Sequence, residues 1–397
     1  MPSVVLRELD DSTKENSVPT EQKHAQRLWD ETDYIPSHYR VTKFDILWLI
    51  ISIVSHICDV VFDLYLAVSY FYFGEKWISA WTFVFIFVPS LTTTVISGRW
   101  YLLDEKENEK KSPLRTLIMR CLALALQLAP TLRYVESLIY ALKSRKYRKK
   151  GDMEKARHFC YLMFKEDADA ALLRVFECYL ESAPQLVLQL SLLMYTTKSV
   201  RTFHEWMRWG SVITSLVSMA WALASYHRSL RYPQENKDNI TYKGMAMQFF
   251  WHLMIVVSRV ISLSCLAYKF PYWIIAGALG HILFCYIYLS FKGPQGTCRN
   301  SCFWENALCL VLATTYIFTA IQAREGPTRW FYAVLYCTFF LENVSMVTVW
   351  FFFVSGEAPA WLMYVIPIAS VVCFILGIIF LLLYHKYFHP KKLPVLN

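Results

Sequence analysis

The sequence predicts an all-α polytopic membrane protein, with eight transmembrane helices and two half-membrane re-entrant helical hairpins in two pseudo-repeated halves. Its 397 residues are 56% apolar and 17% aromatic, a composition that is rare in a soluble protein of this length. Several runs of about 20 residues are nearly free of charge, and a helix of that length crosses the hydrocarbon core. The lysines and arginines gather in short segments between these runs, a pattern typical of cytosolic loops rather than of nucleic-acid binding.

The first predicted span, residues 44–73, carries a polar face. Its polar side chains fall within an arc of about 60° on a helix: Ser52, His56, Asp59 and Asp63. Two acids one turn apart repel each other unless a cation or water lies between them. Two interpretations stay open, namely a buried network in which Arg174 or Arg133 pairs with the acids, and a role in transport. His56 alone is typical of a hydrogen-bonded interior residue, and we predict no metal site.

A second span, 77–103, ends in a highly charged loop, and the next apolar segment covers about 116–142. Pro130 breaks this segment near its middle, and it carries Arg133 and Glu136. Both of its flanks are rich in lysine, which the positive-inside rule places on one side of the membrane. The segment is therefore predicted to be a re-entrant hairpin rather than a full crossing.

The segment 170–195 is long enough to span a membrane but carries one polar stripe. The stripe occupies an arc of about 120° on a helix and consists of Arg174, Glu177, Glu181, Gln185 and Gln189. Each charge at the centre of a membrane helix costs about 2.5 to 3.5 kcal/mol on insertion scales, so the stripe must face protein or water. Pro184 predicts a kink in the helix where the stripe passes Glu181. The stripe forms either a buried ion pair that locks two helices together or a polar path at membrane depth.

The remaining chain repeats this plan. Further spans are predicted at 206–230, 242–268, 272–291, 330–354 and 361–384, with a second hairpin at about 303–323. The first membrane half is then 44–232 and the second 242–385, between a disordered cytosolic tail, 1–43, and a short basic cytosolic tail, 386–397. With two non-crossing hairpins, eight full spans leave both termini in the cytosol.

Several motifs resemble one known family. The stretch FECYLESAPQLVLQL resembles the signature of the XK-related membrane proteins, and the other shared segments are CDVVFDLYLAVSYFYFG, WALASYHRSLR, EGPTRW and YHKYFHP. The resemblance, to the apoptotic scramblase branch, implies eight spans with two half-membrane hairpins and a hydrophilic path for phospholipid headgroups. The path charges that it implies are Asp59, Asp63, Arg174, Glu177 and Glu181, with Arg133 and Arg228, and Gln185 continues the same stripe.

The expected function is phospholipid scrambling in the plasma membrane, which exposes phosphatidylserine during apoptosis. No nucleotide-binding loop is present in the sequence, so lipid movement is expected to be bidirectional and independent of ATP. We predict no enzyme chemistry, cofactor or nucleic-acid partner. The expected partners are membrane phospholipids, an executioner caspase and an accessory membrane subunit. A non-scrambling adaptor of a membrane or lipid-transfer complex, and a solute transporter, are the alternatives.

A protease site is predicted in the N-terminal tail. Residues 30–33 read DETD, which resembles the recognition sequence of executioner caspases, so cleavage is expected after Asp33. Tyr34 is bulkier than the residue that these proteases favour after the cut. The C-terminal tail from His389 contains no aspartate, so control by a caspase must act at the N-terminus or in an internal loop.

Overall fold

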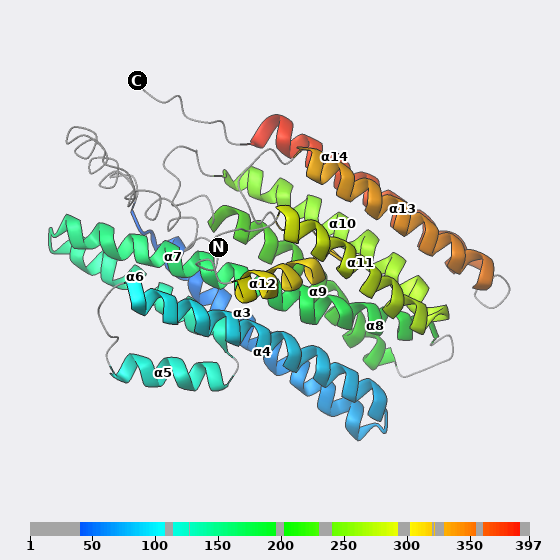
Figure 1. Ribbon diagram of the computed structural model, residues 1–397, viewed down its shortest axis with the longest axis horizontal. Helices are drawn as coiled ribbons and strands as arrows, with labels where there is room; N and C mark the ends of the chain where they lie inside the picture. Colours follow the sequence, from blue (N-terminus) through cyan, green and yellow to red (C-terminus); the bar gives the residue numbers. More distant parts are fainter. Residues whose placement is uncertain are drawn as a thin grey trace. The chain divides into compact units, whose positions relative to one another are not determined.

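The computed structural model describes residues 40–107, 114–126, 128–195, 202–229, 240–292, 302–319, 321, 329–354 and 360–389. All regular secondary structure in these ranges is helical, as predicted (Figure 1). The helices are α3 Lys43–Tyr72, α4 Lys76–Glu107, α5 Leu114–Ala125, α6 Ala129–Lys149, α7 Met153–Glu177, η1 Cys178–Ser182, α8 Ala183–Tyr195, α9 Thr202–Ser229, α10 Tyr242–Lys269, α11 Pro271–Lys292, α12 Cys302–Thr315, α13 Arg329–Val354, α14 Ala360–Leu383 and η2 Tyr384–Phe388.

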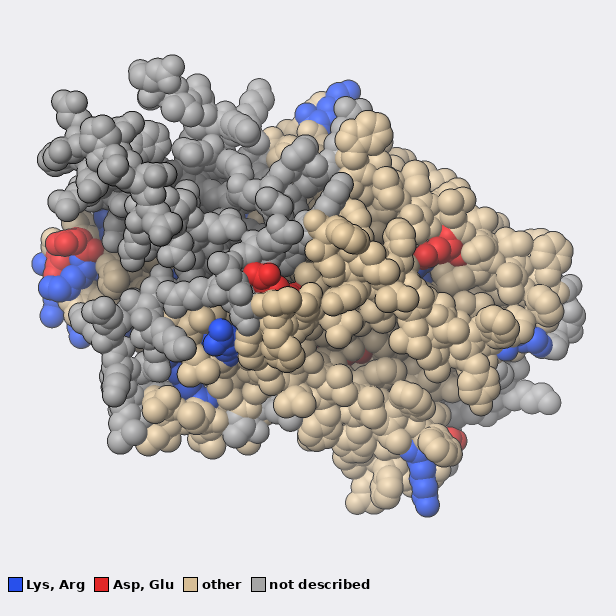
Figure 2. All heavy atoms as spheres, viewed as in Figure 1, with Lys and Arg blue, Asp and Glu red and all other residues tan. Residues whose placement is uncertain are grey.

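Six helices among the described residues are long and apolar enough to cross a membrane. They cover Lys43–Tyr72, Lys76–Leu103, Lys243–Lys269, Pro271–Phe291, Trp330–Val354 and Met363–Phe388, and they match six of the eight predicted spans to within a few residues. The other two predicted spans fall on α7 to α8 and on α9. The first of these contains the charged stripe and the second has polar and charged residues in its end turns, so composition alone does not mark them as crossings. On the face drawn in Figure 2, most of the described surface belongs to residues other than Lys, Arg, Asp and Glu.

The described chain forms two compact units. The first unit contains α3 to α7 and the end of α9 from Ser225. Here α6 packs along α7, α3 packs against α4 and α6, and α4 also contacts α7. Glycines with positive φ make the two tight turns, Gly74 between α3 and α4 and Gly151 between α6 and α7. The C-terminal part of α7 is buried almost without exception, so α7 is the core helix of this unit.

The second unit contains η1, α8, α9 as far as Ala224, and α10 to η2. α10 packs against α8, α11, α13 and α14, and it is the most buried of the six membrane-length helices. A close approach between α10 and α14 depends on Gly377. An added Cβ at this position would lie 2.8 Å from Ile255 Cδ1 and 3.2 Å from the Ile255 backbone nitrogen.

Two helix irregularities lie close to the prolines that the sequence singled out. A π-helical turn, η1, contains Glu181 and ends immediately before α8, in whose first turn Pro184 lies. Proline lacks an N–H donor, so the wider π turn forms where the helix loses that bond. The segment predicted at 116–142 is divided between α5, which ends at Ala125, and α6, which begins at Ala129 and has Pro130 in its first turn. The predicted end at 142 is too early, because α6 continues to Lys149 through lysines and arginines, which are good helix formers.

Candidate functional site

The polar face of α3 meets α7 in a buried ionic network. Arg174 donates from Nη2 to Asp59 Oδ2 at 2.6 Å and from Nη1 to Glu177 Oε2 at 2.7 Å. The other oxygen of Glu177 is 2.7 Å from His56 Nε2, and His56 Nδ1 contacts the Thr131 hydroxyl of α6. These five residues, named here the Arg174 network, join three helices of the first unit through side chains alone.

Burial varies along the Arg174 network. The His56 side chain is fully buried and that of Glu177 is 5% exposed, whereas that of Asp59 is 30% exposed. One end of the network therefore lies in the interior while the other reaches the surface of the unit. Two carboxylates and one guanidinium give a net charge of −1 when His56 is neutral, so the network presents both signs of charge.

Asp63 lies one helical turn beyond Asp59 on the same face of α3 and is half-buried. The sequence left open which arginine pairs with these acids. The structure assigns Arg174 to Asp59. The pair is largely shielded from water midway along a helix that is long and apolar enough to cross a membrane, so the attraction is stronger than at a solvated surface.

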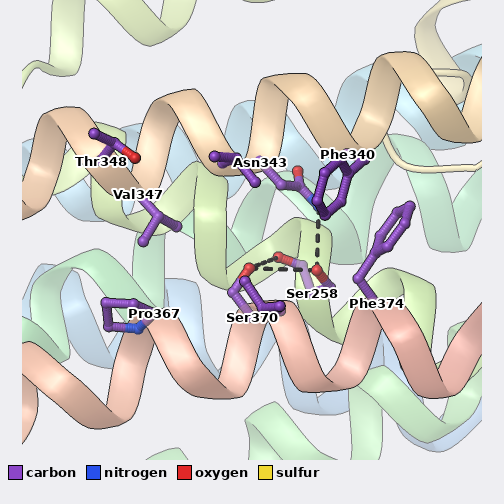
Figure 3. A pocket seen from close by; sticks show the side chains of 10 residues that line it. Ser258, Phe340, Asn343, Val347, Thr348, Pro367, Ser370 and Phe374 are labelled. Atoms are coloured by element: carbon purple, nitrogen blue, oxygen red, sulfur yellow. Dashed lines mark hydrogen bonds between the residues drawn. The ribbon is translucent and has the colours of Figure 1, made fainter.

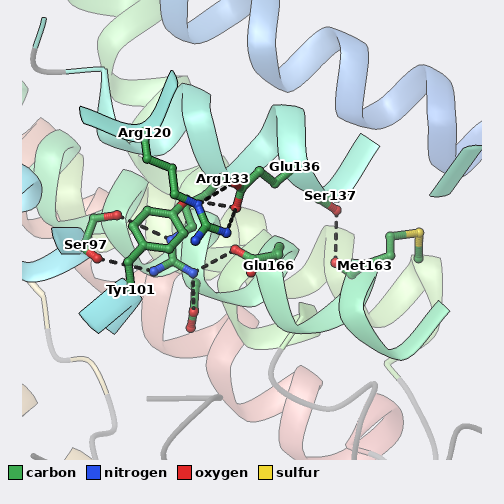
Figure 4. Close-up of polar contacts among 9 residues, drawn as sticks. Ser97, Tyr101, Arg120, Arg133, Glu136, Ser137, Met163 and Glu166 are labelled. Carbon is green, nitrogen blue, oxygen red and sulfur yellow. Dashed lines mark hydrogen bonds and ion pairs between the residues drawn. The ribbon is translucent and has the colours of Figure 1, made fainter. Parts of the chain in front are cut away.

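Arg133 belongs to a second network, shown in Figure 4. It donates from Nη1 to Glu166 Oε2 at 2.7 Å and to Asp169 Oδ2 at 3.1 Å, and its side chain is fully buried. The Tyr101 ring lies between two guanidinium groups, 3.8 Å from that of Arg133 and 4.1 Å from that of Arg120. The carboxylates that the structure pairs with Arg133 are on α7, whereas Asp59 of α3 pairs with Arg174.

Glu136 completes the Arg133 network. It accepts from Arg120 Nε at 2.8 Å and from the Tyr101 hydroxyl at 3.0 Å. The network thus ties α4, α5, α6 and α7 together, and it consists of Ser97, Tyr101, Arg120, Arg133, Glu136, Glu166 and Asp169. Thr131 of the Arg174 network is two residues before Arg133 on α6, so this helix contributes to both networks.

The other predicted path residues lie in both units. Glu181 in η1 and Gln185 in α8 are both buried, and they belong to the second unit. Arg228, near the end of α9, is half-buried in the first unit and interacts electrostatically with Asp167. The neighbouring Ser229 hydroxyl donates to Asp167 at 2.9 Å. Asp33 lies outside the described residues.

The second unit has an ionic network that the sequence did not reveal. Arg259 of α10 donates to Asn343 Oδ1 at 3.0 Å and to the Ile317 carbonyl at 2.7 Å, and it also pairs with Glu342. His281 of α11 contacts Glu342 at 3.0 Å and the Tyr316 carbonyl at 3.1 Å. The Arg259 network therefore joins α10, α11, α13 and the turn after α12. Asn343 stands in a glycosylation sequon, yet it is buried and hydrogen-bonded inside this network.

Comparison with known proteins supplies the family. The family model described as XK-related protein matches residues 47–390. The chain belongs to the XK-related family. Two curated relatives are both called cell death abnormality protein 8, one from Caenorhabditis briggsae and one from Caenorhabditis elegans. Each is 28% identical to this chain over 384 residues, which covers 91% of this chain and 82% of the relative.

All residues of the Arg174, Arg133 and Arg259 networks lie inside the part that matches the XK-related model. The predicted cleavage position, Asp33, lies before the matched range. The match to the family thus covers all three ionic networks, whereas it gives no support to the predicted protease site.

This XK-related chain also has a pocket between α10, α13 and α14, with a volume of about 120 Å³ (Figure 3). Its walls include Phe340, Val347 and Phe374, and its floor is polar. There Asn343 Nδ2 donates to Ser258 Oγ at 3.1 Å, and Ser370 lies 3.3 Å from the same oxygen. Because Asn343 also accepts from Arg259, the floor of the pocket is continuous with the Arg259 network.

Proposed function

We propose that the chain is a phospholipid scramblase that moves phosphatidylserine and other lipids in both directions between the leaflets of the plasma membrane. The Arg174 network carries this proposal. It places two carboxylates and a guanidinium on α3 and α7 of a membrane protein, with Asp59 partly exposed at one end. Charges at membrane depth are costly and usually mark a substrate or ion pathway.

The chemistry of a phospholipid fits this arrangement. Unaided crossing strips the hydration shell from a zwitterionic or anionic headgroup, which costs several kcal/mol or more. Side chains of both signs replace part of that shell, while the acyl chains stay in the surrounding lipid. Such a path lowers the barrier equally in both directions and needs no nucleotide, so net movement follows the lipid gradient.

The proposed topology has eight spans, two half-membrane hairpins and cytosolic termini. At 1.5 Å per residue, α5 with 12 residues and α12 with 14 residues reach only about 18 and 21 Å, short of a hydrocarbon core of about 30 Å. At the turn between α3 and α4, Trp77 is 82% exposed, and at the turn between α10 and α11, Tyr272 is 84% exposed. Exposed Trp and Tyr are enriched at the membrane–water boundary, which supports these turns as interfacial ends of spans.

A role in cell death is proposed from the names of the two relatives and from the DETD segment. An executioner caspase would cleave after Asp33, about ten residues before α3, and release nearly the whole N-terminal tail. The proposed switch is a tail that holds the lipid path closed until it is removed.

A second candidate function is an adaptor in a membrane complex. The observation that favours it is that Arg174, Glu177 and Asp59 already pair with one another, as side chains with a purely structural role would. The two functions differ in whether any form of the chain moves lipid.

Exposure of phosphatidylserine on apoptotic cells tests the proposal. Cells that express the wild-type chain are expected to expose the lipid and to contain a fragment that begins at Tyr34, whereas Asp33→Ala should prevent both. Normal exposure with an uncut N-terminus would remove the caspase switch. No exposure from any form present at the cell surface, including a chain that begins at Tyr34, would contradict scrambling and favour the adaptor.

A further inference from the structure

The turn between α6 and α7 concentrates positive charge. Residues 143–157, named here the basic tip, contain eight cations and two acids, for a net charge of +6. The cations are Lys143, Arg145, Lys146, Arg148, Lys149, Lys150, Lys155 and Arg157. Figure 2 shows lysines and arginines gathered at this end of the α6–α7 pair, at the left of the view. The positive-inside rule requires only a moderate excess of lysine and arginine in a cytosolic loop, and a net charge of +6 in 15 residues is larger than that.

The basic tip has a defined structure, because a tight turn and packed aromatic rings hold its cations in place. Gly151 makes the turn with a φ of +81°, and the rings of Tyr147 and Phe159 stack across it at 5.3 Å. Lys143 Nζ lies 5.3 Å from the Phe159 ring centroid. Asp152 pairs with Lys155 at 2.8 Å, so this acid neutralises only one of the eight cations. Lys146, Lys149 and Lys150 are exposed on this scaffold, and a multivalent anionic surface can reach them.

Packing in the first unit fixes the depth of the tip. Val41 and Ile46, at the start of the first membrane-length helix, pack on the same cluster as Tyr140 of α6 and Tyr161 of α7. The same cluster extends to Ile53 of α3 and Tyr134 of α6, and His56 of α3 contacts Thr131 of α6. Tyr140, nine residues after Thr131, therefore lies toward the end of α3 that begins at Lys43. Lys146 and Lys150 follow it by six and ten residues, or about 9 and 15 Å along α6. The headgroup layer is about 5 to 8 Å thick and the Debye length about 8 Å, so these cations lie within its electrostatic reach.

We infer that the basic tip is a binding site for the headgroups of anionic phospholipids, phosphatidylserine among them, on the cytosolic leaflet. Exposed apolar side chains, Leu142 and Met153, flank the cations, as suits a surface that touches lipid rather than an acidic protein. The inference rests on the cytosolic placement in the proposed topology. It does not require that the chain move lipid.

Spin-labelled lipids measure this selectivity directly. The full chain is reconstituted in phosphatidylcholine vesicles with traces of spin-labelled phosphatidylserine or phosphatidylcholine, and the motionally restricted fraction gives the relative association of each lipid. Wild type is expected to prefer phosphatidylserine, and the preference should fall as salt rises. Lys146→Gln should lower this preference by about fivefold. Lys143→Gln/Lys146→Gln/Lys149→Gln/Lys150→Gln should bring the association of phosphatidylserine close to that of phosphatidylcholine.

Lys76→Gln is the matched control, because Lys76 is also an exposed lysine but is the first residue of α4, just beyond the end of α3 that is remote from Val41 and Ile46. It should leave the preference unchanged. The inference is overturned if the fourfold variant keeps the wild-type preference, as a tip that binds an acidic protein would, or if Lys76→Gln lowers it equally. Helix content by circular dichroism confirms folding, and Lys146→Gln keeps the test valid if the fourfold variant does not fold. Because this experiment measures lipid association and not transbilayer movement, a chain that does not scramble lipid can still show the predicted preference for phosphatidylserine.

Discussion

Arg174 of α7 and Asp59 of α3 form an ion pair of 2.6 Å between residues that are 115 positions apart. The same guanidinium holds Glu177, and Glu177 in turn contacts His56 on α3. Two separate side-chain contacts, Asp59 to Arg174 and His56 to Glu177, thereby join α3 to α7. A change at Arg174 must therefore affect both the stability of the first unit and the charge along the proposed path.

The first prediction compares the two ends of this pair. Arg174→Ala leaves two carboxylates without their shared cation and should lower the free energy of unfolding by about 3 to 5 kcal/mol. Asp59→Asn should cost less, because Asp59 is 30% exposed and Arg174 retains Glu177. Unfolding of the purified proteins in detergent measures both values. Equal losses from the two variants would contradict the assigned geometry.

Asp59→Asn also provides a functional test, since it is expected to fold. We predict a several-fold slower scrambling rate per molecule at normal surface expression, and the same for Glu181→Ala. A rate equal to wild type in both variants would mean that the charges serve structure alone.

The second prediction concerns Arg133, whose side chain is fully buried among its own partners. Arg133→Met should destabilise the chain by about 3 to 5 kcal/mol, because Glu166 and Asp169 lose their cation. Arg133→Met/Glu166→Gln/Asp169→Asn removes the charges together and should recover most of this loss. Unfolding midpoints decide the matter, and no recovery in the triple variant would show that the ion pairs are not the source of the effect.

The third prediction uses the contact between α10 and α14. Gly377→Ala places a Cβ 2.8 Å from Ile255 Cδ1 and close to its backbone, so a side-chain movement cannot relieve all of the overlap. We expect a loss of about 1 to 3 kcal/mol in the unfolding free energy. Gly280→Ala in α11 is the matched control, since nothing lies within 4 Å of its added Cβ. Similar stability for the two variants would refute the close approach.

The fourth prediction concerns sidedness. An epitope inserted at Gly151 should be reached by antibody only after the plasma membrane is permeabilised, and one inserted at Gly74 should be reached on intact cells. Staining of the Gly151 epitope on intact cells would mean that the α5–α6 segment crosses completely. It would also remove the basis for placing the basic tip at the cytosolic leaflet.

Local features were predictable from sequence because their causes are local. Pro184 and Pro130 each mark an interruption, and each interruption lies within a few residues of its proline. Apolar runs of the right length predicted the six membrane-length helices. The stripe of the 170–195 segment was likewise visible from spacing, and its charged members Arg174, Glu177 and Glu181 are indeed buried.

Pairing between distant residues was not predictable in the same way. Glu166 and Asp169 lie just before the apolar run that begins near Ala170, so hydropathy assigned them no role, yet they are the partners of Arg133. In the second unit, Arg259 and Glu342 are 83 positions apart. A single sequence shows that such charges need partners, whereas only the packing of helices shows which partner each one finds.

The central claim is that the chain itself provides a path for lipid headgroups, and reconstituted vesicles test it most directly. The purified chain, before and after removal of residues 1–33, is inserted into vesicles with fluorescent phosphatidylserine in both leaflets, and a membrane-impermeant reductant is added without ATP. We predict that the shortened chain lets the reductant bleach the label of both leaflets, and that Asp59→Asn, which is expected to fold, slows this effect several-fold. Bleaching confined to the outer leaflet with every correctly inserted form would contradict the claim.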